Sequence, residues 1–229
     1  MAIFRGKDFE YDQMQEIQEG LKDGLKVSVY AKPHFEAKQM RQIRLGLKDG
    51  FNLFKYSKAG FDGGQMVQIL EGLRNGDDVS AFAKLEFNAY QMEELRLGLE
   101  EGLNIEVYAK PEFNASQMKE LRLGLGEGVD VSAYAKPEFN LDQMHQIKLG
   151  LKEGLDVSIY AKPEFNHLEM GQIRTGLQEG VDISEYVNPK YTGNQLWLII
   201  NWLKHSLDVA SDLAKPELDY KQMCQIALG

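Results

Sequence analysis

The feature that most constrains the fold of this chain is a 26-residue repeat that accounts for nearly all of its 229 residues. Each unit begins at a Gln-Met pair or a variant of it, and the last full unit carries one extra residue. The units begin at Gln13, Gln39, Gln65, Gln91, Gln117, Gln143, Glu169, Gln195 and Gln222. A unit of this length cannot bury an apolar face alone, so consecutive units must stack side by side.

Each of the seven regular units carries two glycines at fixed places, which we number from the first residue of the unit. Position 12 holds glycines such as Gly128 and Gly154, each followed by Val or Leu, and this pattern predicts a left-handed residue that ends a helix. Position 8 holds glycines such as Gly124 inside the same helix, where glycine costs about 1 kcal/mol relative to alanine. We expect this second glycine to allow close backbone approach between consecutive long helices.

The start of each helix is also marked. Asn140 and Gln143 have the spacing of a capping box, and Phe139 and Met144 have the spacing of a hydrophobic staple, so a long helix of about 13 residues begins there. After the glycine, an aspartate such as Asp156 caps a second, short helix, which ends before proline and is followed by an extended link. The sequence therefore predicts an all-α fold, an α-solenoid of about eight helix-turn-helix repeats.

We expect a single repeat domain over the whole chain. Its parts are an N-terminal partial repeat (1–12), seven regular repeats (13–194), a divergent repeat (195–221) and a truncated repeat (222–229). In the divergent repeat Trp202 and Ser206 replace the two glycines, and Trp197 is added. Its helix is apolar all round and must be buried by a rearranged end of the solenoid, a second copy of the chain or a partner.

The faces of the long helix have different characters. Positions 2, 5 and 9, which are Met118, Leu121 and Leu125 in one unit, are expected to form the core. Position 6 is mostly Arg or Lys, whose stems we expect to lie across the neighbouring unit; an arginine ladder for an acidic partner is the alternative. Position 7 repeats a leucine on the opposite, outer side, and positions 26 and 3 vary there.

A repeated apolar line on an outer surface marks a partner contact, unless neighbouring side chains cover the leucines. The candidate partner-binding residues are Leu45, Leu97, Leu123, Leu149, Tyr90, Glu93, Lys119, His145, Trp197 and Trp202.

Composition argues against several classes of chemistry. A net charge of −9 disfavours binding to a phosphate backbone, and the single cysteine, Cys224, excludes an internal disulfide. The four histidines lie in different units without metal-ligand spacing, and the repeated glycines lack the context of a phosphate loop. The longest apolar run, 196–200, is too short to span a membrane. We expect no catalytic residues, no metal and no cofactor.

The unit QMxxIRxGLxxGLDVSxYAxPxF resembles a poorly characterised 26-residue helical repeat found in proteins of Gram-positive gut bacteria and their mobile genetic elements. The resemblance covers residues 9–229. It implies a cytoplasmic protein of a bacterium, phage or conjugative element and transfers no activity.

The resulting hypothesis is a non-enzymatic scaffold that binds a protein partner through the outer face of its long helices. One alternative is an anti-defence inhibitor that places an acidic surface in the channel of a host nuclease. Another is a structural spacer or homodimer assembled through the helix at 195–207.

Overall fold

The computed structural model describes residues 8–205 and 214–228, and its elements over these ranges are helical, with no strand. This confirms the predicted all-α class. The long helices are α1 (Tyr11–Lys22), α2 (Ala37–Lys48), α4 (Gly63–Asn75), α5 (Ala89–Glu100), α6 (Ala115–Gly126), α7 (Leu141–Lys152), α8 (His167–Gln178), α9 (Gly193–Lys204) and α11 (Tyr220–Leu228).

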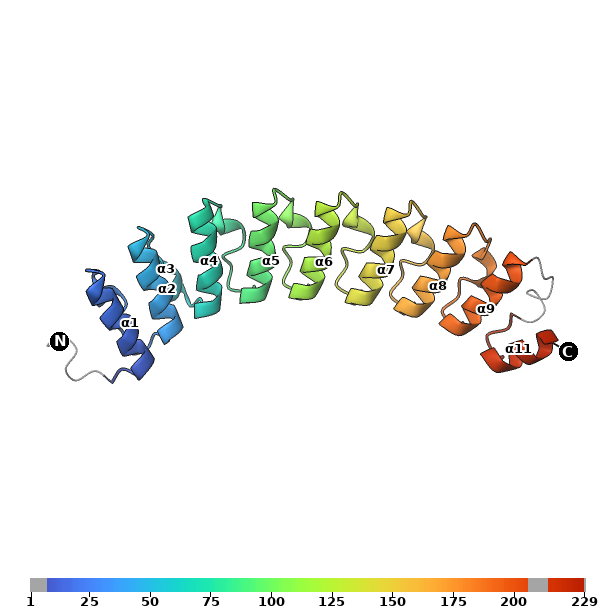
Figure 1. Cartoon of the computed structure of the whole chain (residues 1–229), viewed down its shortest axis with the longest axis horizontal. Coiled ribbons are helices and arrows are strands. Elements are labelled where there is room, and N and C mark those ends of the chain that lie inside the picture. The colour runs from blue at the N-terminus through green and yellow to red at the C-terminus, as the bar shows by residue number, and fades with distance from the viewer. Residues whose placement is uncertain (1–7, 206–213, 229) are drawn as a thin grey trace. The chain divides into compact units, whose positions relative to one another are not determined.

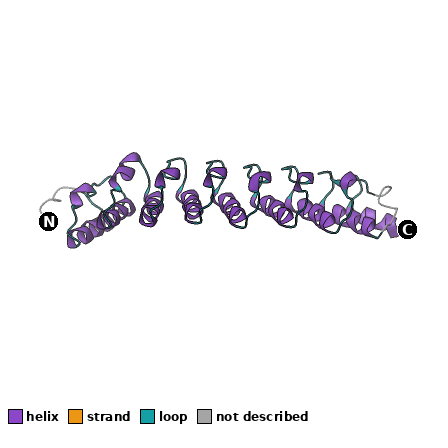
Figure 2. Cartoon of the chain, turned by 90° about the horizontal axis from the view of Figure 1, so that it is seen from above, coloured by secondary structure: helices purple, strands orange, loops and turns teal. Residues whose placement is uncertain are grey.

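Contacts divide the chain into two compact units, Met1–Met118 and Lys119–Gly229. In the first unit α1, α2, α4 and α5 pack side by side in chain order, and in the second unit α7, α8, α9 and α11 do the same (Figure 1). Within each unit the short helices lie along one side of the layer of long helices (Figure 2). Consecutive stacking of this kind is the packing that the repeat predicted.

The predicted start and stop signals of the long helix are confirmed. At α7, Asn140 and Gln143 form a complete capping box. At its end Gly154 has a φ of 72°, and the amide of Leu155 donates to the carbonyl of Gly150 at 2.9 Å. This pair of features is a Schellman ending, so the glycine at position 12 is required by its positive φ.

The short helix is shorter than predicted. It is a single 3-10 turn whose aspartate caps it, as when Asp156 accepts a hydrogen bond from the amide of Ser158 at 3.0 Å. The predicted extended link is a β-turn, because the amide of Phe165 donates to the carbonyl of Lys162 at 3.1 Å. The 3-10 helices are η2 (Val27–Val29), η3 (Val79–Ala81), η4 (Ile105–Val107), η5 (Val131–Ala133), η6 (Val157–Ile159) and η7 (Ser184–Tyr186).

One repeat replaces the 3-10 turn with a true α-helix, α3 (Phe54–Ala59). Its sequence has Ala59 where most other repeats have proline, so no proline restricts the backbone there. The next repeat has Leu85 at that position and keeps its 3-10 turn, so the absence of proline permits the longer helix but does not by itself produce it. Gly60, with a φ of 103°, ends α3.

The core is built from positions 1, 2 and 5. Met144 and Ile147 are fully buried, and Gln143 is 5% exposed. The Gln143 side-chain amide donates to the carbonyl of Phe165 at 2.6 Å and thereby fixes the loop that leads to the next helix. The same bond recurs as Gln13 to Phe35, Gln39 to Phe61, Gln65 to Phe87, Gln91 to Phe113 and Gln195 to Leu218.

The prediction that position 9 belongs to the core is wrong. Leu125 is only half-buried, and its counterpart Leu151 lines a surface hollow of about 380 Å³ together with Leu155 and Val157. Position 9 therefore lies at the edge of the core beside the 3-10 turn and stays partly exposed.

The explanation of the position-8 glycine is also corrected. A Cβ on Gly150 would overlap the hydroxyl of Tyr160 and come within 3.0 Å of Val157, both from the short segment of the same repeat. Gly20, Gly98 and Gly124 face their own tyrosines in the same way. The glycine therefore accommodates an aromatic ring and not, in these repeats, a neighbouring backbone.

Candidate interaction surface

The flanks of the long helices carry a polar ladder that joins consecutive repeats. Position 6 of one helix pairs with position 4 of the preceding one, as when Arg44 binds Glu16 at 2.8 Å and Lys148 binds Glu120 at 2.9 Å. Arg96 and Arg174 contact Gln68 and Gln146 in the same register. The side chains of Arg44 and Lys148 are at most 10% exposed. These cations therefore hold the repeats together and are not available as a ladder for an acidic partner.

A second, more exposed set of ion pairs runs nearer the helix ends. Position 10 of one helix meets the acid at position 11 of the preceding repeat, as in Lys152 with Glu127 at 3.1 Å and Lys204 with Glu179 at 2.8 Å. The hydrogen bond from Lys152 holds the pKa of Glu127 below its usual range. These pairs occupy carboxylates that an acidic binding surface would need.

The outer face of each long helix consists of positions 26, 3, 7 and 10. Three of the predicted position-7 leucines, Leu45, Leu97 and Leu149, are half-buried, and Leu123 is 38% exposed. These leucine side chains are therefore neither fully buried nor fully exposed, and part of each apolar side chain remains accessible on the outer face. Tyr90, at position 26, is far more exposed, at 72%.

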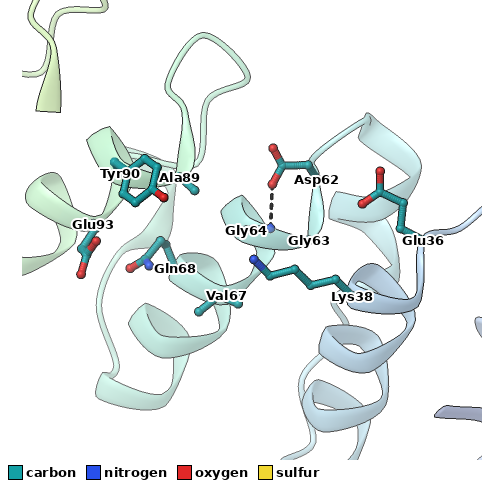
Figure 3. Close-up of a pocket in the computed structure, with 10 residues that line it drawn as sticks. All are labelled: Glu36, Lys38, Asp62, Gly63, Gly64, Val67, Gln68, Ala89, Tyr90 and Glu93. Atoms are coloured by element: carbon teal, nitrogen blue, oxygen red, sulfur yellow. Dashed lines mark hydrogen bonds between the residues drawn. The ribbon is translucent and has the colours of Figure 1, made fainter. Parts of the chain in front are cut away.

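In the first unit the outer face is hollowed between α2, α4 and α5 (Figure 3). The hollow has a volume of about 480 Å³ and arises because α4 begins with Gly63 and Gly64, which leave no side chain above its first turn. Lys38 of α2 lies across these glycines, and Tyr90 and Glu93 of α5 stand on the other side. Asp62 caps α4 through the amide of Gly64, and its carboxylate lies at the hollow together with those of Glu36 and Glu93.

The hollow continues into a groove of about 360 Å³ between α2 and α4, which shares Lys38 and Val67 with it. The groove is lined by Lys38, Arg41, Gln42, Leu45, Val67, Leu70, Glu71 and Arg74. Its walls carry three cations and one carboxylate, in a chain whose net charge is −9.

In the second unit the outer face carries different side chains at the same places. His145 is half exposed, with Nδ1 3.2 Å from Glu120 Oε1. Leu141 and Leu168 are 42% and 62% exposed at the starts of α7 and α8. Lys119, at position 3 of α6, is exposed as well.

The divergent helix α9 is buried mainly within its own unit. Trp202 is 5% exposed and Ile200 is 4% exposed, and α9 packs between α8 and α11. Trp202 therefore belongs to the internal packing, whereas Trp197 is 48% exposed and its ring lies tilted against that of Tyr220, with 6.4 Å between the ring centroids. Ser206, the other predicted substitution, lies outside the described residues.

The titratable groups do not converge on an acid-base site in the described part of the chain. The clearest shifts belong to buried structural tyrosines: burial raises the pKa of Tyr30 to about 12 and also raises those of Tyr134 and Tyr160. Over residues 8–205 and 214–228, no three His, Cys, Asp or Glu side chains cluster as metal ligands. Nor does any helix there have the length and apolar character needed to cross a lipid bilayer.

The fold and surface define an all-α helical-repeat protein with a constant inner frame and a varied outer face. Comparison with protein-family models, curated proteins and solved structures gives no match.

Neither the hollow nor the groove was predicted from the sequence. The signal was present, because Gly63-Gly64 is a glycine pair at positions 25 and 26, where the neighbouring repeats have Ala37-Lys38 and Ala89-Tyr90. Its meaning depends on side chains from two other repeats, which the local pattern does not bring together.

Proposed function

We propose that this protein is a non-enzymatic repeat scaffold that binds a protein partner through the outer face of its long helices. The observation that carries the proposal is the contrast between the two sides of each helix. Inward positions repeat the same residues, while positions 26 and 3 change from Lys38 and Arg41 to Tyr90 and Glu93 within one unit. Repeat proteins build binding surfaces by varying outward side chains on a fixed frame.

The surface chemistry supports this proposal. Tyr90 and Trp197 are large aromatic side chains that remain 72% and 48% exposed, and residues of this type dominate the energetics of protein interfaces. The half-buried leucines at position 7 add apolar edges beside them. The polar ladder, by contrast, is occupied by contacts between repeats.

Site-specific photo-crosslinking tests the proposal. A photoreactive amino acid placed at Glu93, Lys119 or His145 on the outer face should crosslink one partner in the native host. The same amino acid at Ser80, Ser132 or Ser158, which are exposed on the short helices, should not. Crosslinks that arise only from the short helices would refute the proposal.

The same experiment separates the two alternatives from the proposal. An inhibitor of a nuclease would crosslink to a basic nuclease, and the complex would weaken steeply with salt. A spacer would crosslink to a second copy of this chain, through residues near Trp197. Neither outcome is expected if the partner is a different protein held by apolar and polar contacts together.

A further inference from the structure

We infer that the groove between α2 and α4 binds an acidic amphipathic helix of the partner. This inference rests on the proposed function and names the chemistry of the segment that the outer face takes. It begins from the groove lining, in which the cations Lys38, Arg41 and Arg74 outnumber the single carboxylate, Glu71.

Ion pairs with neighbouring residues involve some of these charges and leave others exposed. Glu71 is bound by Arg96 of α5 at 3.1 Å, and Arg74 is bound in turn by Asp49 at 2.5 Å. Lys38 makes no hydrogen bond or ion pair with any residue that the structure describes, and it is exposed. Arg41 is 62% exposed and reaches only Glu16, at 3.9 Å, which Arg44 holds more closely at 2.8 Å. Two cations on one wall therefore lack a close counter-charge.

Apolar surface lies between these cations. Leu45 and Val67 are both half-buried, and each presents part of its side chain to the groove. A ligand that meets both the charge and the apolar floor must itself be amphipathic, with carboxylates beside an apolar side chain. This is the pattern of a helix that lays one face into a groove.

The dimensions agree with a short helical segment. Lys38, Arg41 and Leu45 follow one another along the same face of α2, and the seven steps from Lys38 to Leu45 rise about 10 Å along the helix axis. About two turns of a ligand helix match that length, so carboxylates one turn apart can meet Lys38 and Arg41 together.

The far end of the groove limits where such a helix can lie. The hollow at this end carries Glu36 on the α2 side, Asp62 at the start of α4 and Glu93 of α5, of which Asp62 and Glu36 cap helices. These carboxylates repel an acidic segment, so the acidic face of the ligand lies beside Lys38 and Arg41 and does not extend past Lys38 into the hollow.

The test uses two stapled helical peptides of about 15 residues labelled with a fluorophore. One has a leucine seam flanked by glutamates, and the other has lysines in place of every glutamate. The net charge of −9 favours the lysine peptide if attraction to the whole chain decides binding. Binding of the glutamate peptide, measured by fluorescence anisotropy, requires a local cationic site.

We expect the glutamate peptide to bind and the double variant Lys38→Glu, Arg41→Glu to weaken it by at least ~10-fold. The matched control is Lys55→Glu, Lys58→Glu, which changes the net charge equally at two exposed lysines of α3 and should leave the affinity within about twofold. The variant Val67→Glu, which places a carboxylate on the groove floor, should also weaken the glutamate peptide. Circular dichroism of each variant confirms that it is folded.

Preference for the lysine peptide, or equal loss in both double variants, would overturn this inference. So would partner crosslinks from Glu93, Lys119 and His145 that persist unchanged in the Lys38→Glu, Arg41→Glu variant; in that case the scaffold function would stand and only the groove assignment would fail.

Discussion

The hydroxyl of Tyr30 fills the space that a side chain on Gly20 would occupy. This hydroxyl also donates a hydrogen bond to the carbonyl of Glu16 at 3.0 Å, and Glu16 lies one turn before Gly20 in α1. Tyr108 stands in the same relation to Gly98. The glycine and the ring form one packing unit, so the long helix and the short helix of a repeat cannot vary independently at these positions.

The first prediction concerns Gly150. Alanine there improves helix propensity by about 1 kcal/mol, yet its Cβ would overlap the Tyr160 hydroxyl. We expect Gly150→Ala to lower the free energy of unfolding by about 1–3 kcal/mol, the usual cost of overpacking. Urea denaturation followed by circular dichroism measures this change.

The control is Gly126→Ala at the end of α6, where a Cβ would meet no atom within 4 Å. That variant should be as stable as the parent or slightly more so. If both variants proved equally stable, steric exclusion by the tyrosine would be the wrong explanation for the repeated glycine.

The second prediction concerns Glu169, which stands where most of the other described repeats have a buried glutamine. Its carboxylate is 7% exposed and accepts two hydrogen bonds from Asn166, but it has no amide to donate to the following loop as Gln143 does. Glu169→Gln should therefore raise the free energy of unfolding by about 1 kcal/mol, the net worth of one hydrogen bond.

The reverse change, Gln143→Glu, should destabilise the protein, because the carbonyl of Phe165 would lose its donor. Thermal or urea unfolding of both variants tests the pair. An equal effect of the two changes in the same direction would contradict the role given to the amide.

The parts of the fold that the sequence predicted are those fixed by residues close in the chain. The capping box of Asn140 and Gln143 and the left-handed Gly154 depend on neighbours within a turn of helix, and both are confirmed. The reason for Gly150 was missed because Tyr160 lies ten residues on and its ring direction depends on the 3-10 turn. Helical periodicity likewise placed Leu125 in the core, because periodicity does not show how far the short segment extends over the helix.

The candidate surface was predicted in outline only. The outward direction of Tyr90, Lys119, His145 and Trp197 followed from helix geometry, and all four are exposed. The burial of Trp202 and the hollow over Gly64 depend on contacts between repeats, which no single repeat encodes.

The third prediction tests the ladder between repeats. Arg44 binds Glu16 at 2.8 Å, and both side chains are at most 15% exposed, so Arg44→Ala leaves a carboxylate poorly solvated and without its main partner. We expect a loss of about 1–3 kcal/mol in the free energy of unfolding, below the cost of breaking a fully buried pair.

Lys48→Ala is the matched control, because Lys48 lies on α2 with Arg44 and also pairs with the preceding repeat. Its partner is Asp23 at 3.2 Å, but the Lys48 side chain is 57% exposed. Exposed pairs contribute at most about 1 kcal/mol, so this variant should be nearly as stable as the parent. Urea titrations of both variants measure the difference, and a larger loss for Lys48 would refute the structural role of the buried ladder.

The fourth prediction concerns alkaline pH. Burial raises the pKa of Tyr30 from 10.0 to about 12, with Arg44 acting in the opposite direction. In the unfolded chain this phenol ionises near pH 10, so between the two values unfolding releases a proton. The stability that Tyr30 contributes is therefore fully present below pH 10 and falls as the pH rises to about 12. Urea unfolding at a series of pH values should show this decline.

The control is Tyr30→Phe, which removes the group that ionises and keeps the ring, as Phe82 does naturally over Gly72. The free energy of unfolding of this variant should fall less steeply with pH than that of the parent. The same slope for the variant and the parent would show that Tyr30 does not contribute to the alkaline transition.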